Sequence, residues 1–187
     1  MRSIKKAGIV ILILTIPASI ILFLHGFGTN EFNLPVYYQN GLPDSLGCDA
    51  EKRNTIHTVS LETRGASASV FYVIANDQLF KEELVRVIEN FPDLSVNVHI
   101  LGAGIKGKKE IITYLNTLRI SESRFNFIDT ALNENRIRLC ELGLTNDKPI
   151  TSAVLCDKDG AIRGYYDLND REEVDRLILE IRVLNHD

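Results

Sequence analysis

Buried strands alternate with amphipathic helices along most of this chain. The apolar runs Ser69–Ala75 and Leu94–Leu101 predict two strands with both faces buried, and Arg124–Asp129 predicts a third. Apolar residues at helical spacing predict helices over residues 77–91, 108–119 and 132–142. Because strands that alternate with helices form mainly parallel sheets, the pattern predicts an α/β fold with helices on both faces of a central sheet.

The C-terminal third predicts a β-hairpin followed by a helix. Ser152–Cys156 and Ala161–Tyr166 form the two strands, and Gly160 supplies the positive φ that the turn between them needs. Asp170 is the expected N-cap of a helix over Arg171–Leu184. A terminal hairpin and helix distinguish a thioredoxin-like sheet from a doubly wound nucleotide-binding one. Nearer the N-terminus, the weak alternation of Ile56–Leu61 predicts an edge strand.

The first 27 residues have a different composition from the rest of the chain. Residues 1–6 are basic, and residues 7–27 hold no Asp, Glu, Lys or Arg, which is long enough to span a membrane as a helix. The basic flank predicts a single-pass signal-anchor in the inner (plasma) membrane with a cytoplasmic N-terminus; a cleaved signal peptide is the alternative. A linker over residues 28–54 and a periplasmic or other extracytoplasmic domain over residues 55–187 are expected to follow.

The net charge and the cysteine content argue against some classes of function. A net charge of −4 does not provide the excess of positive charge that is typical of nucleic-acid-binding proteins. The three cysteines form no CxxC pair. Cys140 and Cys156 are expected to pack as small buried apolar residues, whereas Cys48, in the linker, is a candidate for a reactive or intermolecular role. His57 and His99 lie in predicted strands and are expected to be structural.

Three blocks of the sequence resemble the SCO1/SenC family. They are the anchor followed by Asn33–Tyr38, the short block His57–Val59, and, most specifically, the hairpin Ser152–Asp167 with Glu173–Ile178 after it. The resemblance covers the whole chain in order. It implies a membrane-anchored thioredoxin-like fold in cytochrome c oxidase biogenesis or envelope redox traffic. It also implies copper as cofactor and, as partner, a respiratory-oxidase subunit or another envelope protein.

The chain departs from this family at the copper site. The family's CxxxC motif falls near Asn76 and Phe80, and its histidine falls near Pro149. An amide, a phenyl ring and a proline offer none of the soft ligands that Cu(I) prefers. We therefore expect no metal site, no cofactor and no catalytic residue, and the residues favour a non-catalytic binding or assembly factor over an enzyme.

One motif supports a different function. Gly102, Gly104 and Gly107 match GxGxxG after a predicted strand, and Asp129 ends the next strand. That layout is typical of a dinucleotide-binding unit, in which the acidic residue binds a ribose hydroxyl. However, bulky Ile111 follows in the helix, and a whole strand–helix unit precedes the motif. A nucleotide-binding protein or enzyme is the alternative prediction.

Overall fold

The computed structural model describes residues 13, 15–22, 33–48, 55–61, 66–74, 82–92, 96–102, 108–145 and 152–186. The chain divides into two units, Met1–Asn33 and Leu34–Asp187. In the first unit, residues 15–22 are helical and exposed. Most of the predicted span over residues 7–27 lies outside the described residues, and within them no helix has the length and apolar character to cross a membrane.

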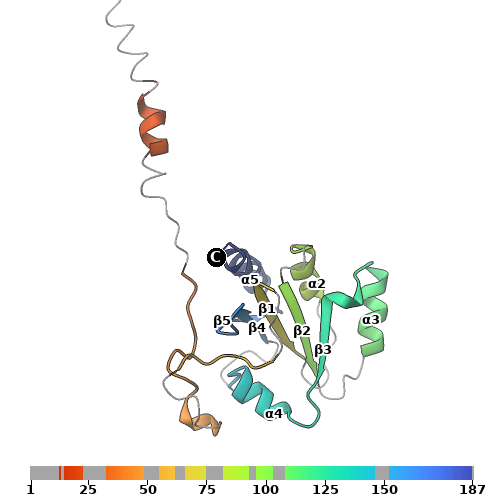
Figure 1. Ribbon diagram of the computed structural model, residues 1–187. Helices are drawn as coiled ribbons and strands as arrows, with labels where there is room; N and C mark the ends of the chain where they lie inside the picture. Colours follow the sequence, from red (N-terminus) through yellow and green to blue (C-terminus); the bar gives the residue numbers. More distant parts are fainter. Residues whose placement is uncertain are drawn as a thin grey trace, which may run out of the picture. The chain divides into compact units, whose positions relative to one another are not determined.

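The second unit contains one mixed sheet of five strands (Figure 1). The strands are β1 (Ala68–Val73), β2 (Val96–Gly102), β3 (Phe125–Asp129), β4 (Ser152–Asp157) and β5 (Ile162–Asp167). Their spatial order is β3-β2-β1-β4-β5. The first three are parallel, β4 runs antiparallel to β1, and β5 runs antiparallel to β4. The predicted parallel strands and terminal hairpin are therefore confirmed.

Three helices pack on the same hydrophobic cluster at one face of the sheet. They are α2 (Glu82–Glu89), α3 (Lys108–Thr117) and α5 (Arg171–Leu184). Alternate strand residues such as Val70, Val98 and Leu155 point into this cluster, as the period of two along a strand requires. Asp170 accepts a hydrogen bond from the Glu172 backbone N–H at 2.9 Å, so the predicted N-cap of α5 is confirmed.

The opposite face is covered by irregular structure. The connection from β3 to β4 carries the short helix α4 (Glu134–Arg136), which continues as a π-helical turn, η5 (Ile137–Glu141). Beside it lies the lead-in segment, residues 34–48 and 55–61, with the 3₁₀ turn η1 (Asp44–Leu46). Leu142 and Leu144 after η5, and Val59 of the lead-in segment, pack on Phe71 and its neighbours. Regular helices therefore cover mainly one face.

The predicted edge strand at Ile56–Leu61 is wrong. Thr58 makes one isolated bridge to Ala161, and the Val59 backbone N–H donates to Gly160 O at 2.9 Å. A strand needs a ladder of such pairs, and within the described residues this segment pairs with the sheet only beside the turn of the hairpin. Its alternation arises because His57 and Val59 point inward along an extended chain that is not part of the sheet.

Gly164 in β5 is expected to be essential for the packing of this edge. A Cβ atom at this position would lie 2.8 Å from Cε2 of Tyr166, whose side chain is fully buried. Gly164→Ala should therefore lower the free energy of unfolding by roughly 1–3 kcal/mol, measured by chemical denaturation. Gly102→Ala is the matched control, because its Cβ would meet Ile74 at an ordinary 3.7 Å. Equal stability of the two variants would contradict the expected overlap.

Candidate functional site

The carboxyl ends of β1, β2 and β3 meet at one edge of the sheet, where ligand sites of α/β folds commonly lie. β4 begins at this edge, because Ala153 pairs with Tyr72 near the end of β1. The positions expected for the family's copper ligands, near residues 76, 80 and 149, lie outside the described residues. The sequence has no cysteine between Cys48 and Cys140, so the stretch directly after β1, where the family has its CxxxC motif, holds none.

A disulfide joins Cys48 of the lead-in segment to Cys140 of η5. Their Cα atoms are 5.5 Å apart, and 92 positions separate them along the chain. Both cysteines are partly exposed. The expectation that Cys140 packs as a free apolar residue is wrong, and Cys48 is paired within the chain rather than free for an intermolecular bond. The bridge ties the lead-in segment to the connection between β3 and β4.

Three side chains bind the backbone carbonyls around the end of η5. The contacts are His57 Nε2 to Glu141 O at 2.8 Å, Tyr165 Oη to Leu142 O at 2.8 Å, and Tyr38 Oη to Gly143 O at 3.0 Å. Carbonyls at a helix end lack partners within the helix, so these donors satisfy groups that would otherwise need water. Burial, followed by a hydrogen bond with Tyr38, raises the pKa of Tyr165, which keeps its hydroxyl protonated as a donor.

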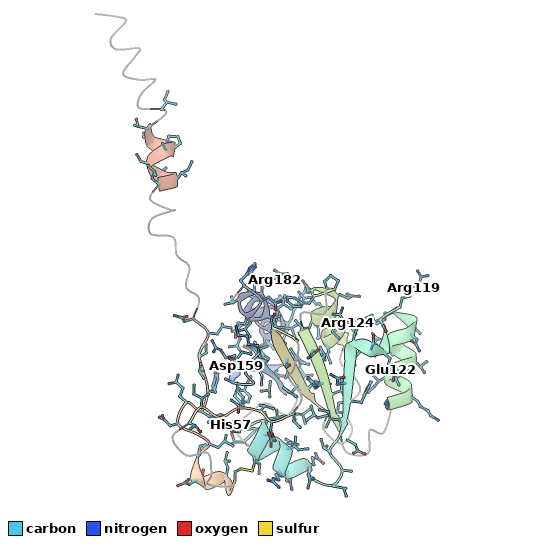
Figure 2. All side chains as sticks on the ribbon, in the orientation of Figure 1. His57, Arg119, Glu122, Arg124, Asp159 and Arg182 are labelled. Atoms are coloured by element: carbon cyan, nitrogen blue, oxygen red, sulfur yellow. A yellow bond between two sulfur atoms is a disulfide. The ribbon has the colours of Figure 1, made fainter. Side chains whose placement is uncertain are left out.

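The Glu141 side chain adds a further link next to Cys140. Its Oε2 accepts from the Ser60 backbone N–H at 2.8 Å and from the Ser60 hydroxyl at 2.6 Å. Figure 2 shows His57, on the same stretch of the lead-in segment, beside the helical turn that follows β3. The disulfide is thus surrounded by non-covalent links between the same two segments.

Cys156, the third cysteine, is fully buried in β4. Burial, and then the neighbouring charge of Asp157, raises the pKa of its thiol. The thiolate is the form that attacks disulfides and binds soft metals, so this residue is unsuited to both tasks. The prediction that Cys156 packs as a small buried residue is confirmed.

His99 is buried on β2 with 1% of its surface exposed. Its ring stacks on Phe71 with centroids 4.5 Å apart, and neither ring nitrogen has a hydrogen-bond partner among the residues that the structure describes. Burial lowers the pKa of His99 to about 4. The buried hydroxyl of Ser69, on the neighbouring strand, likewise has no hydrogen-bond partner within the described part of the chain. His99 of β2 pairs with Phe71 of β1, and Cys156 of β4 pairs with Ser69 on the other side of β1. The imidazole and the thiol therefore lie on two strands that β1 separates.

Copper does not fit the side chains that the structure describes. In these parts of the chain, no three His, Cys, Asp or Glu side chains are placed to hold one metal ion. Two of the three cysteine sulfur atoms are joined in the disulfide, and the third belongs to a buried thiol with a raised pKa. Cu(I) prefers thiolate or thioether ligands, which these groups do not offer in the oxidised protein.

The alternative nucleotide motif is only partly within the described residues. Gly102 at the end of β2 pairs directly with Asp129 at the end of β3, so the structure brings these two together. Gly104 and Gly107 lie outside the described residues. Asp129 Oδ1 accepts from the Ala131 backbone N–H at 2.9 Å, which gives the carboxylate a role in its own turn. Nucleotide binding stays a prediction.

The sequence pattern did not show the disulfide or the cluster of hydrogen bonds around η5. Pairing of cysteines 92 positions apart depends on tertiary placement. The available signal was that three cysteines in a domain expected to be exported leave room for one pair. His57 gave a second signal, since a histidine in a weakly alternating segment needs a partner for its ring.

The comparisons with known proteins give structural similarity without sequence similarity. No family model and no curated protein matches the sequence. A SCO1/SenC family lipoprotein from Bacillus anthracis aligns with a TM-score of 0.50 and 12% identity, over 64% of this chain and 82% of that one. The soluble domain of Sco1 from Bacillus subtilis gives 0.46 and 14%, over 81% and 95%. The mitochondrial 2-Cys peroxiredoxin from Plasmodium falciparum gives 0.41 and 12%, over 64% and 76%.

At this identity, the B. anthracis structure is informative about the fold alone. Together with the strand order and the terminal hairpin, it identifies a thioredoxin-like α/β fold with a mixed five-stranded sheet. Function has to be argued from the residues of this chain.

Proposed function

We propose that this chain is a membrane-anchored, Sco-like protein that acts as a non-catalytic binding or assembly factor in cytochrome c oxidase biogenesis, without the family's copper site. The observation that supports the proposal is where its cysteines lie and in what state. None occurs between Cys48 and Cys140, and Cys156 is buried, so the fold is present without an exposed thiol after β1. The sequence resemblance of the hairpin, seen here as β4 and β5, supports the Sco-like assignment.

Export of the domain is part of this proposal. Disulfides persist in oxidising compartments such as the bacterial periplasm and are rare in the cytosol. The Cys48–Cys140 bridge therefore supports an extracytoplasmic location for the second unit, as does the apolar stretch over residues 7–27. A respiratory-oxidase subunit or another envelope protein would be the partner.

Deletion of the gene in its source organism, followed by complementation, tests this role. We expect deletion to lower the amount of assembled cytochrome c oxidase, measured from membrane haem spectra and oxygen consumption. The full chain should restore it, and a chain in which residues 1–27 are replaced by a cleavable signal peptide should restore less. Unchanged oxidase in the deletion strain would contradict the proposal.

A further inference from the structure

We infer that the Cys48–Cys140 disulfide is a thiol–disulfide exchange site, which an external dithiol reduces and which closes again while the domain stays folded. Neither cysteine belongs to the two hydrophobic clusters of the fold. Both are partly exposed, and a Cβ atom placed on Gly47, next to Cys48, would meet no atom of the described residues within 4 Å. The partial exposure of both cysteines gives an attacking thiolate access to the bridge.

The segments joined by the bridge are also held together without it. Tyr38 Oη donates to Gly143 O, His57 Nε2 lies against Glu141 O, and Ser60 donates twice to the Glu141 carboxylate. The Tyr37 backbone N–H donates to Ile162 O at 2.9 Å, which fixes the lead-in segment to β5 as well. None of these bonds requires the sulfur–sulfur bond. Reduction therefore leaves the two thiols on segments that remain side by side.

The exchange has two balanced steps. A thiolate of the dithiol attacks one sulfur of the bridge, so that a mixed disulfide forms while the Cys48–Cys140 bond breaks and the displaced cysteine leaves as a thiolate. The second thiol of the reagent then attacks the mixed disulfide and releases the other cysteine. The protein disulfide gains two electrons and two protons, and the dithiol becomes a disulfide. The natural reductant is thus an exported protein or small molecule that carries a dithiol.

Cys156 distinguishes exchange in the folded protein from reduction through unfolding. Its thiol is fully buried in β4, so it reacts with an alkylating reagent only when the sheet opens. Full-length oxidised protein in a mild detergent is incubated with dithiothreitol at neutral pH and sampled with iodoacetamide. Mass spectrometry of the peptides then reports alkylation of each cysteine over time.

We expect Cys48 and Cys140 to become alkylated together while Cys156 stays unmodified. When the reduced protein is freed of dithiothreitol and treated with trans-4,5-dihydroxy-1,2-dithiane before iodoacetamide is added, all three cysteines should stay unmodified, because the bridge has closed again. Alkylation of Cys156 at the same rate as the other two would overturn the inference, as would a bridge that opens only in denaturant. This test does not depend on the proposed role in oxidase assembly, whose failure would show only in the deletion strain.

A single-hydroxyl variant tests the contribution of the surrounding bonds. Tyr38→Phe removes the hydroxyl that donates to Gly143 O, and we expect the reduced variant to close its disulfide more slowly than the wild type. Thr113→Val is the matched control, because it also removes a hydroxyl bound to a backbone carbonyl, that of Lys109 in α3. Equal closure rates in the wild type and Tyr38→Phe would show that the bond does not hold the thiols together.

Discussion

Replacing both Cys48 and Cys140 by serine is expected to lower the free energy of unfolding of the oxidised protein by about 4–5 kcal/mol. The bridge closes a loop across 92 positions, and a cross-link of that span removes much of the conformational freedom of the unfolded chain. The native contacts of the lead-in segment should persist, because they do not involve sulfur. Chemical denaturation of the wild type and the double variant, without reductant, measures the difference.

The reduced wild type serves as the matched control for this prediction. Its unfolding midpoint should fall to that of the double variant, and reductant should leave the variant unchanged. Coincident midpoints of the oxidised wild type and the double variant would contradict a stabilising bridge. They would also remove the structural reason to place the pair in an oxidising compartment.

Acidification is expected to destabilise the fold through His99. Its pKa is lowered from 6.5 to about 4 in the folded protein, so between these pH values the unfolded chain binds a proton that the folded protein does not. The stability that comes from neutral His99 is therefore fully present above pH 6.5 and is lost as the pH decreases toward 4. The loss from this one residue is about 3 kcal/mol, which denaturation at a series of pH values would measure.

His99→Phe isolates this effect from that of the carboxylates. Phenylalanine retains an aromatic ring for stacking on Phe71 but does not titrate, so the stability difference between variant and wild type should change across this pH window. A difference that is constant from pH 7 to pH 4 would show that His99 is protonated as easily in the fold as in the unfolded chain.

Local sequence patterns predicted those strands and helices that are buried, because burial requires apolar residues at a regular spacing. The run Ser69–Ala75 became β1, with every residue from Ala68 to Val73 buried. Gly160 has φ +83° in the hairpin turn, where the sequence required a positive value. The helix expected over 132–142 is only partly regular, since α4 continues as the π-helical turn η5. Apolar spacing alone does not distinguish these two helical forms.

Features that depend on distant contacts were not accessible from the same patterns. The segment Ile56–Leu61 alternates because His57 and Val59 point inward, yet it makes one bridge to Ala161 rather than a ladder. The helical spacing around Cys140 is the same whether its side chain packs in the core or forms a disulfide. Its pairing with Cys48 follows from how the lead-in segment lies beside η5, which only the folded chain determines.

The exchange site and the assembly role are compatible within one protein. The proposal for oxidase biogenesis requires that no copper ligand set remains, and the disulfide occupies the two cysteines outside the core. A dithiol that opened the bridge would leave the lead-in segment, which follows the predicted membrane anchor along the chain, held by its non-covalent contacts without the covalent one. The redox state of the compartment would then act on the part of the domain nearest the anchor in sequence.

A Cu(I) titration of the full-length Cys48→Ser/Cys140→Ser variant, in detergent and against a competing chelator, tests the claim that this chain lacks a copper site. The variant removes the pair whose thiols would bind Cu(I) after accidental reduction, and leaves the buried Cys156 in place. A Sco-like fold without the family's copper site predicts that the chelator keeps all the copper. Stoichiometric transfer of one Cu(I) ion to the variant would contradict that claim.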